Sequence, residues 1–201
     1  MAAAQSAPRR QYRMVARAEA VAANGERMLA SAWARFCAQP FDEVRLADVA
    51  ADAAVTVQTL YARFGTKEEL FVSAWRWFAK PQGARRDSVA VGDVRAGIRA
   101  LYDDYERHGE AVLRLMAQEE RISAVREMID SGRAYHRDWV ARVFAPMLDG
   151  LTPADRQRRH VALIVATDLL VWKLLRKDMK LGRKEAERIV TEMVTNSKGA
   201  H

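Results

Sequence analysis

Apolar side chains recur at helical spacing along most of the chain, and no runs alternate between apolar and polar residues. The first pattern is typical of amphipathic helices and the second of strands, so the sequence predicts an all-α protein. The first helix is expected from residue 24 or earlier to Ala38, because the residue before Pro40 is pushed out of the helical region.

Two short helices are predicted next, over residues 46–53 and 57–64, joined by the turn Ala54-Val55-Thr56. The first has one apolar face, made of Leu46, Val49, Ala50 and Ala53. In the second, Leu60 and Phe64 face inward, and the Thr56 hydroxyl is the predicted N-cap. The residues turned largely outward at or near its start are Val57, Gln58, Thr59, Tyr61 and Arg63. Two helices at this spacing indicate a helix-turn-helix, a unit that reads DNA.

Downstream, the pattern predicts a helix over residues 66–78 that starts with a capping box at Thr66 and is ended by Pro81. Residues 80–88 show no period and are interpreted as a hinge. Further helices are expected over residues 91–105, 112–116, 125–143, 161–176 and 184–194, with an interruption at Gly109 and a restart at Thr152-Pro153. The predicted domains are a basic flexible arm over residues 1–23, a helix-turn-helix domain with the start of the connecting helix over 24–79, and a larger helical bundle over 80–201.

The composition indicates a class of binding partner only through its charge. The chain has 201 residues, a formal net charge of +7 and an isoelectric point of about 9.8, which favours a polyanion. Four basic residues precede the first apolar helix and fit either a solvated tail or an arm that reaches a DNA groove: Arg9, Arg10, Arg13 and Arg17. No apolar run approaches the ~18 to 20 residues of a membrane span, and the first residues lack a secretion signal, so a cytoplasmic protein without a membrane partner is expected. The single cysteine, Cys37, is expected to be a small buried thiol.

A set of residues at fixed spacing gives the region around the predicted turn a distinctive signature. The set is Val49-Ala50, Ala53, Val55-Thr56, Thr59-Leu60-Tyr61, Phe64 and Thr66-Lys67-Glu68-Glu69-Leu70. Through it the chain resembles the tetracycline repressor (TetR) family of transcriptional regulators over residues 26–78. The resemblance implies an N-terminal three-helix DNA-binding domain joined to a larger helical domain for ligand binding and dimerisation.

Two residues depart from the family pattern. Ala54 stands where the family usually has glycine, and Pro40-Phe41 replaces the usual glycine before an aromatic residue. If the backbone at Ala54 needs a positive φ, alanine is unfavourable there by on the order of 1 kcal/mol.

The chemistry of DNA reading assigns roles to the outward residues. Gln58 can offer an amide donor and acceptor to adenine, Val57 can contact a thymine methyl group, and Arg63 suits either bases or phosphates. The resemblance further implies that Thr59 and Tyr61 donate hydroxyls to phosphates, and that Arg45 and Lys67 contact the DNA backbone. Other roles stay open, since Tyr61 could pack between helices, Lys67 could be a solvated lysine and Arg45 could pair with Asp48.

One such unit makes too few base contacts for useful specificity, so a homodimer on a roughly palindromic operator is expected. The final two helices, 161–176 and 184–194, look like the dimer-forming end of the family. The resemblance also implies a helical cavity for an unknown small-molecule effector, and the candidate ligand-binding residues are Tyr102, Tyr105, Met116, Tyr135, Trp139, Asp168 and Trp172. Asp168 lies on an apolar helix face and needs a partner, which could be an arginine, a backbone donor or the effector.

The functional hypothesis is a dimeric transcriptional regulator, a repressor released from its operator by the effector. A helical enzyme or an interaction module that uses the aromatic cavity is the alternative. An enzyme would have to work through His108, His136 or His160 with an acid such as Asp138 or Asp168. No metal-spaced cluster, phosphate loop or serine elbow accompanies these residues, so no enzyme, cofactor or metal is expected.

Overall fold

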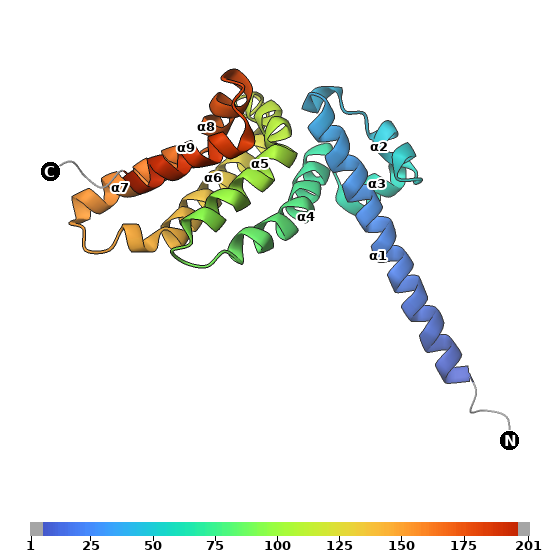
Figure 1. The fold of residues 1–201 in the computed structure, drawn as a ribbon. Helices are drawn as coiled ribbons and strands as arrows, with labels where there is room; N and C mark the ends of the chain where they lie inside the picture. The colour runs from blue at the N-terminus through green and yellow to red at the C-terminus, as the bar shows by residue number, and fades with distance from the viewer. Residues whose placement is uncertain (1–5, 197–201) are drawn as a thin grey trace. The chain divides into compact units, whose positions relative to one another are not determined.

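The computed structural model describes the backbone of residues 6–196 and the side chains of residues 21–196. Helices and the turns between them make up the described part of the chain, so the all-α prediction is confirmed (Figure 1). The chain divides into two compact units, Met1–Phe78 and Ala79–His201, which we call the N-terminal and C-terminal units. The boundary expected from the sequence lay one residue later, between residues 79 and 80.

The N-terminal unit contains α1 (Ser6–Ala38), the short 3-10 turn η1 (Phe41–Glu43), α2 (Leu46–Asp52), α3 (Val57–Phe64) and the first half of α4 (Lys67–Asp87). Its core is built on aromatic rings. Phe36 packs at 5.0 Å from Phe71 and 5.2 Å from Phe41, measured between ring centroids. Phe41, the residue after Pro40, is therefore buried where the family pattern differs, and its ring takes part in the core.

Helix α1 begins at Ser6, so residues 6–23 are helical where a flexible arm was expected. The physical reason is composition, because residues 9–24 lack glycine and proline and are rich in alanine and arginine, both good helix formers. The side chains of Arg9, Arg10, Arg13 and Arg17 lie outside the described residues, and the role of this segment stays a prediction.

The C-terminal unit contains the end of α4, then α5 (Val94–Met116), α6 (Ser123–Val143), the 3-10 turn η2 (Ala145–Met147), α7 (Pro153–Ala166), α8 (Leu169–Lys173), the π-helical turn η3 (Leu174–Asp178) and α9 (Arg183–Asn196). Helix α5 packs against α6, α8 and α9, and α7 against α6 and α9. The apolar core between them includes Leu101, Trp139, Val143, Leu163, Trp172 and Val190. A larger helical bundle is thus confirmed. Its predicted cap at Thr152 is also present, since the Thr152 hydroxyl accepts from Asp155 N.

Gly109 does not interrupt a helix, contrary to expectation, because α5 runs unbroken from Val94 to Met116. The glycine instead makes room for a tryptophan: a Cβ at position 109 would lie 2.6 Å from Cζ3 and 2.8 Å from Cη2 of Trp172. The indole reaches this place from a residue more than 60 positions later, so the spacing pattern around Gly109 could not reveal it.

Pro81 does not end α4 either, since that helix continues to Asp87. A proline inside a helix removes a hydrogen bond and disfavours the turn before it. Contacts with α6 offset this cost: Trp139 Nε1 donates to Arg86 O at 2.9 Å, and the Tyr135 hydroxyl lies 3.3 Å from Gly83 O. Tertiary hydrogen bonds therefore keep helical the segment that was predicted to be a hinge.

The helix predicted over residues 161–176 is broken at Thr167-Asp168 into α7 and α8. The Thr167 hydroxyl donates back to Leu163 O at 2.7 Å, and the Asp168 carboxylate caps α8 by accepting from Leu170 N at 2.8 Å. Both side chains therefore satisfy backbone groups at the break. The partner expected for Asp168 is a backbone donor of its own chain. Asp168 caps α8 and does not lie on the face of one continuous helix.

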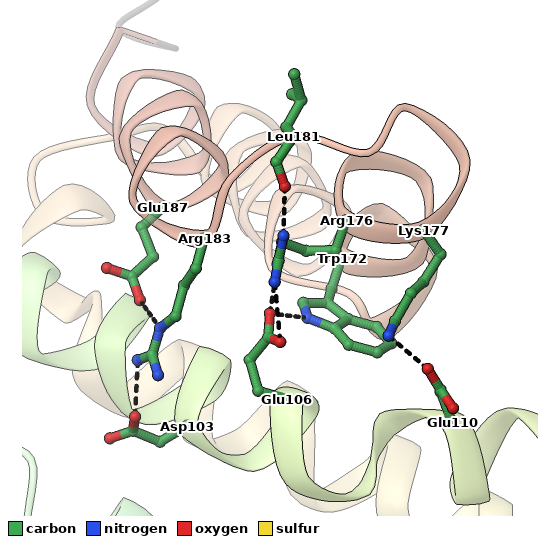
Figure 2. A network of polar contacts seen from close by, with 9 residues as sticks. All are labelled: Asp103, Glu106, Glu110, Trp172, Arg176, Lys177, Leu181, Arg183 and Glu187. Atoms are coloured by element: carbon green, nitrogen blue, oxygen red, sulfur yellow. Dashed lines mark hydrogen bonds and ion pairs between the residues drawn. The ribbon is translucent and has the colours of Figure 1, made fainter.

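Three carboxylates of α5 face cations from the segment after α8, as Figure 2 shows. Asp103 accepts from Arg183 at 2.7 Å, Glu106 accepts from Arg176 Nε at 2.5 Å and Nη2 at 3.1 Å, and Glu110 pairs with Lys177. Glu106 also accepts from the indole nitrogen of Trp172 at 3.0 Å. These pairs fix the π-helical turn and α9 on α5.

We expect Gly109→Ala to destabilise the protein by about 1–3 kcal/mol, because the added Cβ would collide with the Trp172 ring. Gly132→Ala on α6 is the matched control, since nothing lies within 4 Å of a Cβ built there. This control should gain about 0.5–1 kcal/mol from helix propensity. Urea unfolding of both variants measures the difference, and equal effects of the two changes would contradict the packing described here.

Candidate nucleic-acid interface

The turn between α2 and α3 is closed by backbone hydrogen bonds. Val55 N donates to Ala50 O at 2.9 Å, and Ala54 N donates to Ala51 O at 3.1 Å. Ala54 adopts a φ of 54°, the left-handed region in which alanine is strained and glycine is not. Ala54, which departs from the family pattern, is therefore strained, and the turn forms in spite of this strain.

Helix α3 begins as predicted from Thr56. The Thr56 Oγ1 accepts from Thr59 N at 3.2 Å and lies 2.9 Å from Thr59 Oγ1, so the two hydroxyls share one hydrogen bond at the start of the helix. The next helix start is also confirmed as a capping box: Thr66 N donates to Glu69 Oε2 at 2.7 Å, and Glu69 N donates to Thr66 Oγ1 at 3.2 Å. The backbone donor at Thr66 holds the pKa of Glu69 below its usual range.

The two faces of α3 differ as the spacing predicts. Leu60 is buried and Phe64 is half-buried, whereas Gln58 is exposed and Tyr61 keeps 54% of its surface exposed. Val57 and Thr59 are half-buried. The amide of Gln58 and the phenol of Tyr61 are thus accessible together on one rigid helix, and the alternative that Tyr61 packs between helices does not hold.

The three predicted cations of this surface all have contacts within the chain. Arg45, highly exposed, donates to the Asp48 carboxylate from Nε at 3.1 Å. Lys67 Nζ donates to Asp42 O at 3.2 Å and lies 4.9 Å from the centre of the Phe41 ring, and partial burial lowers the pKa of Lys67. The guanidinium of Arg63 stacks near the ring of Phe64. Phosphate contacts by these side chains remain predictions. For Arg45, such a contact would replace a hydrogen bond to the Asp48 carboxylate by a hydrogen bond to a phosphate oxygen.

The Arg63 guanidinium also lies against α1 at Gly25, where any Cβ would collide with it. No local sequence pattern pairs these two positions, because they are far apart in the chain.

The predicted ligand residues of the C-terminal unit are spread over α5, α6 and α8, and most of their polar ends are already bound. The Tyr105 hydroxyl donates to Thr167 O at 2.9 Å, the Tyr135 hydroxyl lies 3.0 Å from Asp87 Oδ1, and burial raises the pKa of Tyr135 to about 12. Trp139, Asp168 and Trp172 use their polar atoms in the contacts given above.

Tyr102 is the exception, since its buried hydroxyl has no hydrogen-bond partner among the described residues. Met116 is half-buried at the end of α5. Which of these side chains touch a ligand remains a prediction.

His136 is buried in a chain of hydrogen bonds that the sequence did not reveal. Its Nε2 lies 3.1 Å from Thr167 Oγ1, and its Nδ1 lies 3.1 Å from Arg86 Nη2. Because the Thr167 hydroxyl proton points to Leu163 O, Thr167 accepts from Nε2–H, and Nδ1 is left to accept from Arg86. Burial and the nearby Arg86 lower the pKa of His136 to about 3, so the ring is neutral at physiological pH.

Arg86 was missed as a site residue because it stood in the supposed hinge. Its guanidinium carbon lies 4.8 Å from the Trp139 ring centre and 5.2 Å from that of Tyr135, and its Nε is 3.9 Å from Asp104 Oδ2. A helical period carried past Pro81 would have placed Gln82 and Arg86 on one face of α4, four residues apart.

Residues 28–74 match the family model of the bacterial regulatory proteins of the tetR family. No curated protein matches the chain. The region matched contains the end of α1, the corner of α2 and α3, and the start of α4, which is the surface described above.

Solved structures of bacterial regulators share the fold of most of the chain. A putative transcriptional regulator from Pseudomonas aeruginosa PAO1 superposes with a TM-score of 0.67 at 14% identity, over 85% of this chain and 88% of that one. A TetR-like transcriptional regulator from Rhodococcus sp. RHA1 gives a TM-score of 0.63 at 18% identity, over 87% and 94% of the two chains. A tetR-family transcriptional regulator from Streptomyces coelicolor gives 0.62 at 18% identity, over 85% and 78%. Within the described residues, no helix has the length and apolar character needed to cross a membrane.

Ala54→Gly should stabilise the protein by up to about 1 kcal/mol, since glycine adopts a φ of 54° without steric cost. Ala34→Gly, at an exposed position inside α1, is the control and should lose about 1 kcal/mol through helix propensity. Thermal unfolding of the two variants distinguishes them. A loss of stability in Ala54→Gly would show that alanine is not strained at this turn.

The depressed pKa of His136 makes stability depend on pH. The unfolded chain takes up a proton on this ring below pH about 6.5, whereas the folded protein does so only near pH 3. The free energy of unfolding should therefore fall as the pH is lowered from about 7 to 4, with His136 contributing at most about 1.4 kcal/mol per pH unit. Denaturation of His136→Gln between pH 7 and 5 should show a smaller slope than the parent, and Gln157→Ala, which removes no titratable group, should keep the parental slope. Parallel curves for all three proteins would refute a neutral buried His136.

Proposed function

We propose that the chain is a TetR-family homodimeric repressor that a small-molecule effector releases from its operator, and the match of residues 28–74 to the family model of the tetR-family bacterial regulatory proteins supports this proposal. DNA reading belongs to the N-terminal unit, and effector binding and dimerisation belong to the C-terminal unit. Acting on the bacterial chromosome, the protein works in the cytoplasm, and this role requires no catalytic residue.

The observation that supports DNA reading best is the accessibility of Gln58 and Tyr61 on α3. A helix that enters the major groove needs side chains that reach base edges and others that fix its register on phosphates. The Gln58 amide suits an adenine, and the Tyr61 hydroxyl suits a phosphate oxygen. The Thr56 cap and the buried Leu60 hold the helix that presents them.

The distribution of charge indicates where the attraction to phosphates comes from. Residues 21–78 contain six lysines and arginines and seven aspartates and glutamates, so this part of the domain carries a net charge of −1. The excess of positive charge near the reading head lies in the preceding segment, with its four arginines at positions 9, 10, 13 and 17. We therefore propose that this segment contributes phosphate contacts and that α3 contributes specificity.

Exposed apolar side chains on the C-terminal helices support a dimer. Val161 and Val165 lie one turn apart on α7, and Leu170 and Leu174 lie one turn apart on α8 and η3, each with about half of its surface exposed. Clusters of this kind favour an interface with another chain. A twofold dimer would place two copies of α3 about 34 to 36 Å apart on a palindromic site.

Effector release requires coupling between the two units, typically of 1 to 3 kcal/mol. Helix α4 is the element common to both units, because it runs without a break from Lys67 to Asp87. Its last turns are bound to α6 through Tyr135, Trp139 and Arg142, the last of which donates to Asp87 Oδ1 at 3.3 Å. A ligand that changes these contacts between α4 and α6 would act directly on the helix that starts beside the DNA-reading corner.

The decisive experiment measures affinity for oligonucleotides selected from a random pool, as a function of salt concentration. We expect a preferred sequence and a steep salt dependence for the parent protein. Gln58→Ala should lose about 1–3 kcal/mol of discrimination at one base position, and Gln157→Ala, at an exposed glutamine of α7, should lose none. A parent protein without sequence preference would exclude the proposed function.

The same titration separates the contribution of the arginine segment. Replacing Arg9, Arg10, Arg13 and Arg17 by glutamine should reduce the slope of log K against log salt by up to about 3.6, since each phosphate contact contributes about 0.9. The control replaces four exposed arginines of the C-terminal unit, so that the change in net charge is the same: Arg95, Arg99, Arg107 and Arg137. Equal slopes for the two variants would assign the phosphate contacts elsewhere.

The dimer is tested by placing a charge on its proposed surface. Val165→Glu and Leu170→Glu should dissociate the dimer in analytical ultracentrifugation and weaken operator binding, because a buried unpaired carboxylate is costly. Val91→Glu is the control, since Val91 is equally exposed but lies in the loop before α5. A dimer that survives both changes must use another surface.

A further inference from the structure

A buried arginine lies where α4, α5 and α6 meet in the C-terminal unit. Only 12% of the Arg86 side chain is exposed, and its guanidinium carbon lies over the Tyr135 ring, 5.2 Å from the ring centre, and over the Trp139 ring, 4.8 Å from the ring centre. We call Arg86, Gln82, Asp104 and these two rings the Arg86 cluster.

The guanidinium of Arg86 is poorly satisfied for so buried a group. It offers five N–H donors, yet its single hydrogen bond within the described residues goes to Nδ1 of the neutral His136 ring. The nitrogen Nε has no hydrogen-bond partner there, because the nearest carboxylate oxygen, on Asp104, is 3.9 Å away. Hydrogen-bonded arginine and carboxylate groups approach to about 2.7–2.9 Å.

Arg176 in the same unit shows how this chain satisfies a structural arginine. Its Nε and Nη2 both donate to Glu106, at 2.5 and 3.1 Å, and Nη1 donates to Leu181 O (Figure 2). Arg176 is more exposed than Arg86, so its need for partners is smaller. The contrast indicates that Arg86 is not simply a packed structural residue.

A second unpartnered group lies one helical turn away from Arg86. The buried Oε1 of Gln82 has no hydrogen-bond partner among the described residues. Residues four apart lie on the same face of a helix, so Gln82 and Arg86 present an amide and a guanidinium side by side on α4. Unsatisfied buried polar atoms are rare in folded proteins, and two on one face call for a ligand that supplies their partners.

We propose that the Arg86 cluster binds a small organic carboxylate. The carboxylate would accept a forked pair of hydrogen bonds from Arg86, while the faces of Tyr135 and Trp139 would cover an apolar or aromatic body. A polar donor on the same molecule would satisfy the Gln82 amide. The inference rests on the proposed function for its biological meaning, since this carboxylate would be the effector.

Asp104 is the group that could oppose an incoming carboxylate. Burial raises the pKa of Asp104, because the Arg86 guanidinium at 3.9 Å compensates only part of the lost hydration. The Asp104 carboxyl is therefore protonated more easily than a surface aspartate, and it can become neutral when a second carboxylate arrives. Arg86 then neutralises the ligand in place of Asp104.

The test uses benzoate and benzamide, two probes of nearly the same shape that differ in charge. Isothermal titration calorimetry on the full-length protein should show saturable benzoate binding at one site per chain, with benzamide at least tenfold weaker. Arg86→Gln should weaken benzoate binding at least tenfold, whereas Arg85→Gln, at the exposed arginine next to it, should change the binding less than twofold. Equal binding of the two probes, the absence of benzoate binding with a Kd of about 1 mM or tighter, or equal effects of the two variants would overturn the proposal.

A second measurement does not depend on the stability of Arg86→Gln. The nuclear magnetic resonance signal of the Arg86 Nε–H, assigned by its disappearance in Arg86→Lys, should shift when benzoate is added to the parent protein. A signal that stays in place would overturn the proposal even if benzoate binds elsewhere.

Failure of the site and failure of the regulator can be told apart. A parent protein that prefers an operator sequence but does not bind benzoate at Arg86 remains a regulator with another effector chemistry, which overturns the inference alone. A protein that binds benzoate through Arg86 but shows no DNA preference supports the site and overturns the proposed function.

Discussion

Polar groups buried in a helical bundle must find partners inside it, and this requirement shapes most of the C-terminal unit. The break between α7 and α8 exists where Thr167 and Asp168 satisfy backbone groups at two helix ends. The same Thr167 hydroxyl accepts from His136, which fixes the tautomer of a ring that has to be neutral to be buried. The helix ends, the His136 tautomer and the Arg86 guanidinium are therefore linked in one network. Arg86 is the member of this network whose hydrogen-bond donors are not all satisfied within the described part of the chain.

The N-terminal unit follows a simpler rule, in which short-range contacts are sufficient. The corner of α2 and α3 needs a buried apolar face, a hydroxyl cap and a left-handed residue, all within about twenty positions of the chain. Side chains that do not serve the corner are left to solvent, and Gln58 and Tyr61 are among them. Accessibility of these groups thus results from the way the helix is held.

The range of these contacts explains how much could be predicted from the sequence. The caps at Thr56, Thr66 and Thr152, the buried Leu60 and the all-α class depend on neighbours within a few residues, and the structure confirms them. Gly109 and Pro81 were misinterpreted because their environment is set by Trp172 and by Tyr135 and Trp139, more than 50 residues away. Local helix propensity permits a break in the helix at both positions. Packing against residues distant in the chain keeps both helices continuous. Arg86 was overlooked for the same reason, since its partners come from α5 and α6.

The continuity of α4 through Pro81 joins these two kinds of contact. A helix with a proline in its middle lacks one backbone hydrogen bond, so it resists bending less at that position than elsewhere. The segment after the proline is held by side chains of α6, and the segment before it starts with the Thr66 capping box beside the DNA-reading corner. The carboxylate proposed for Arg86 would add a charged partner to a side chain that already contacts His136, Tyr135 and Trp139. Under the proposed function, this added partner would change the forces on the end of α4, and the weakened position at Pro81 is where the helix would yield.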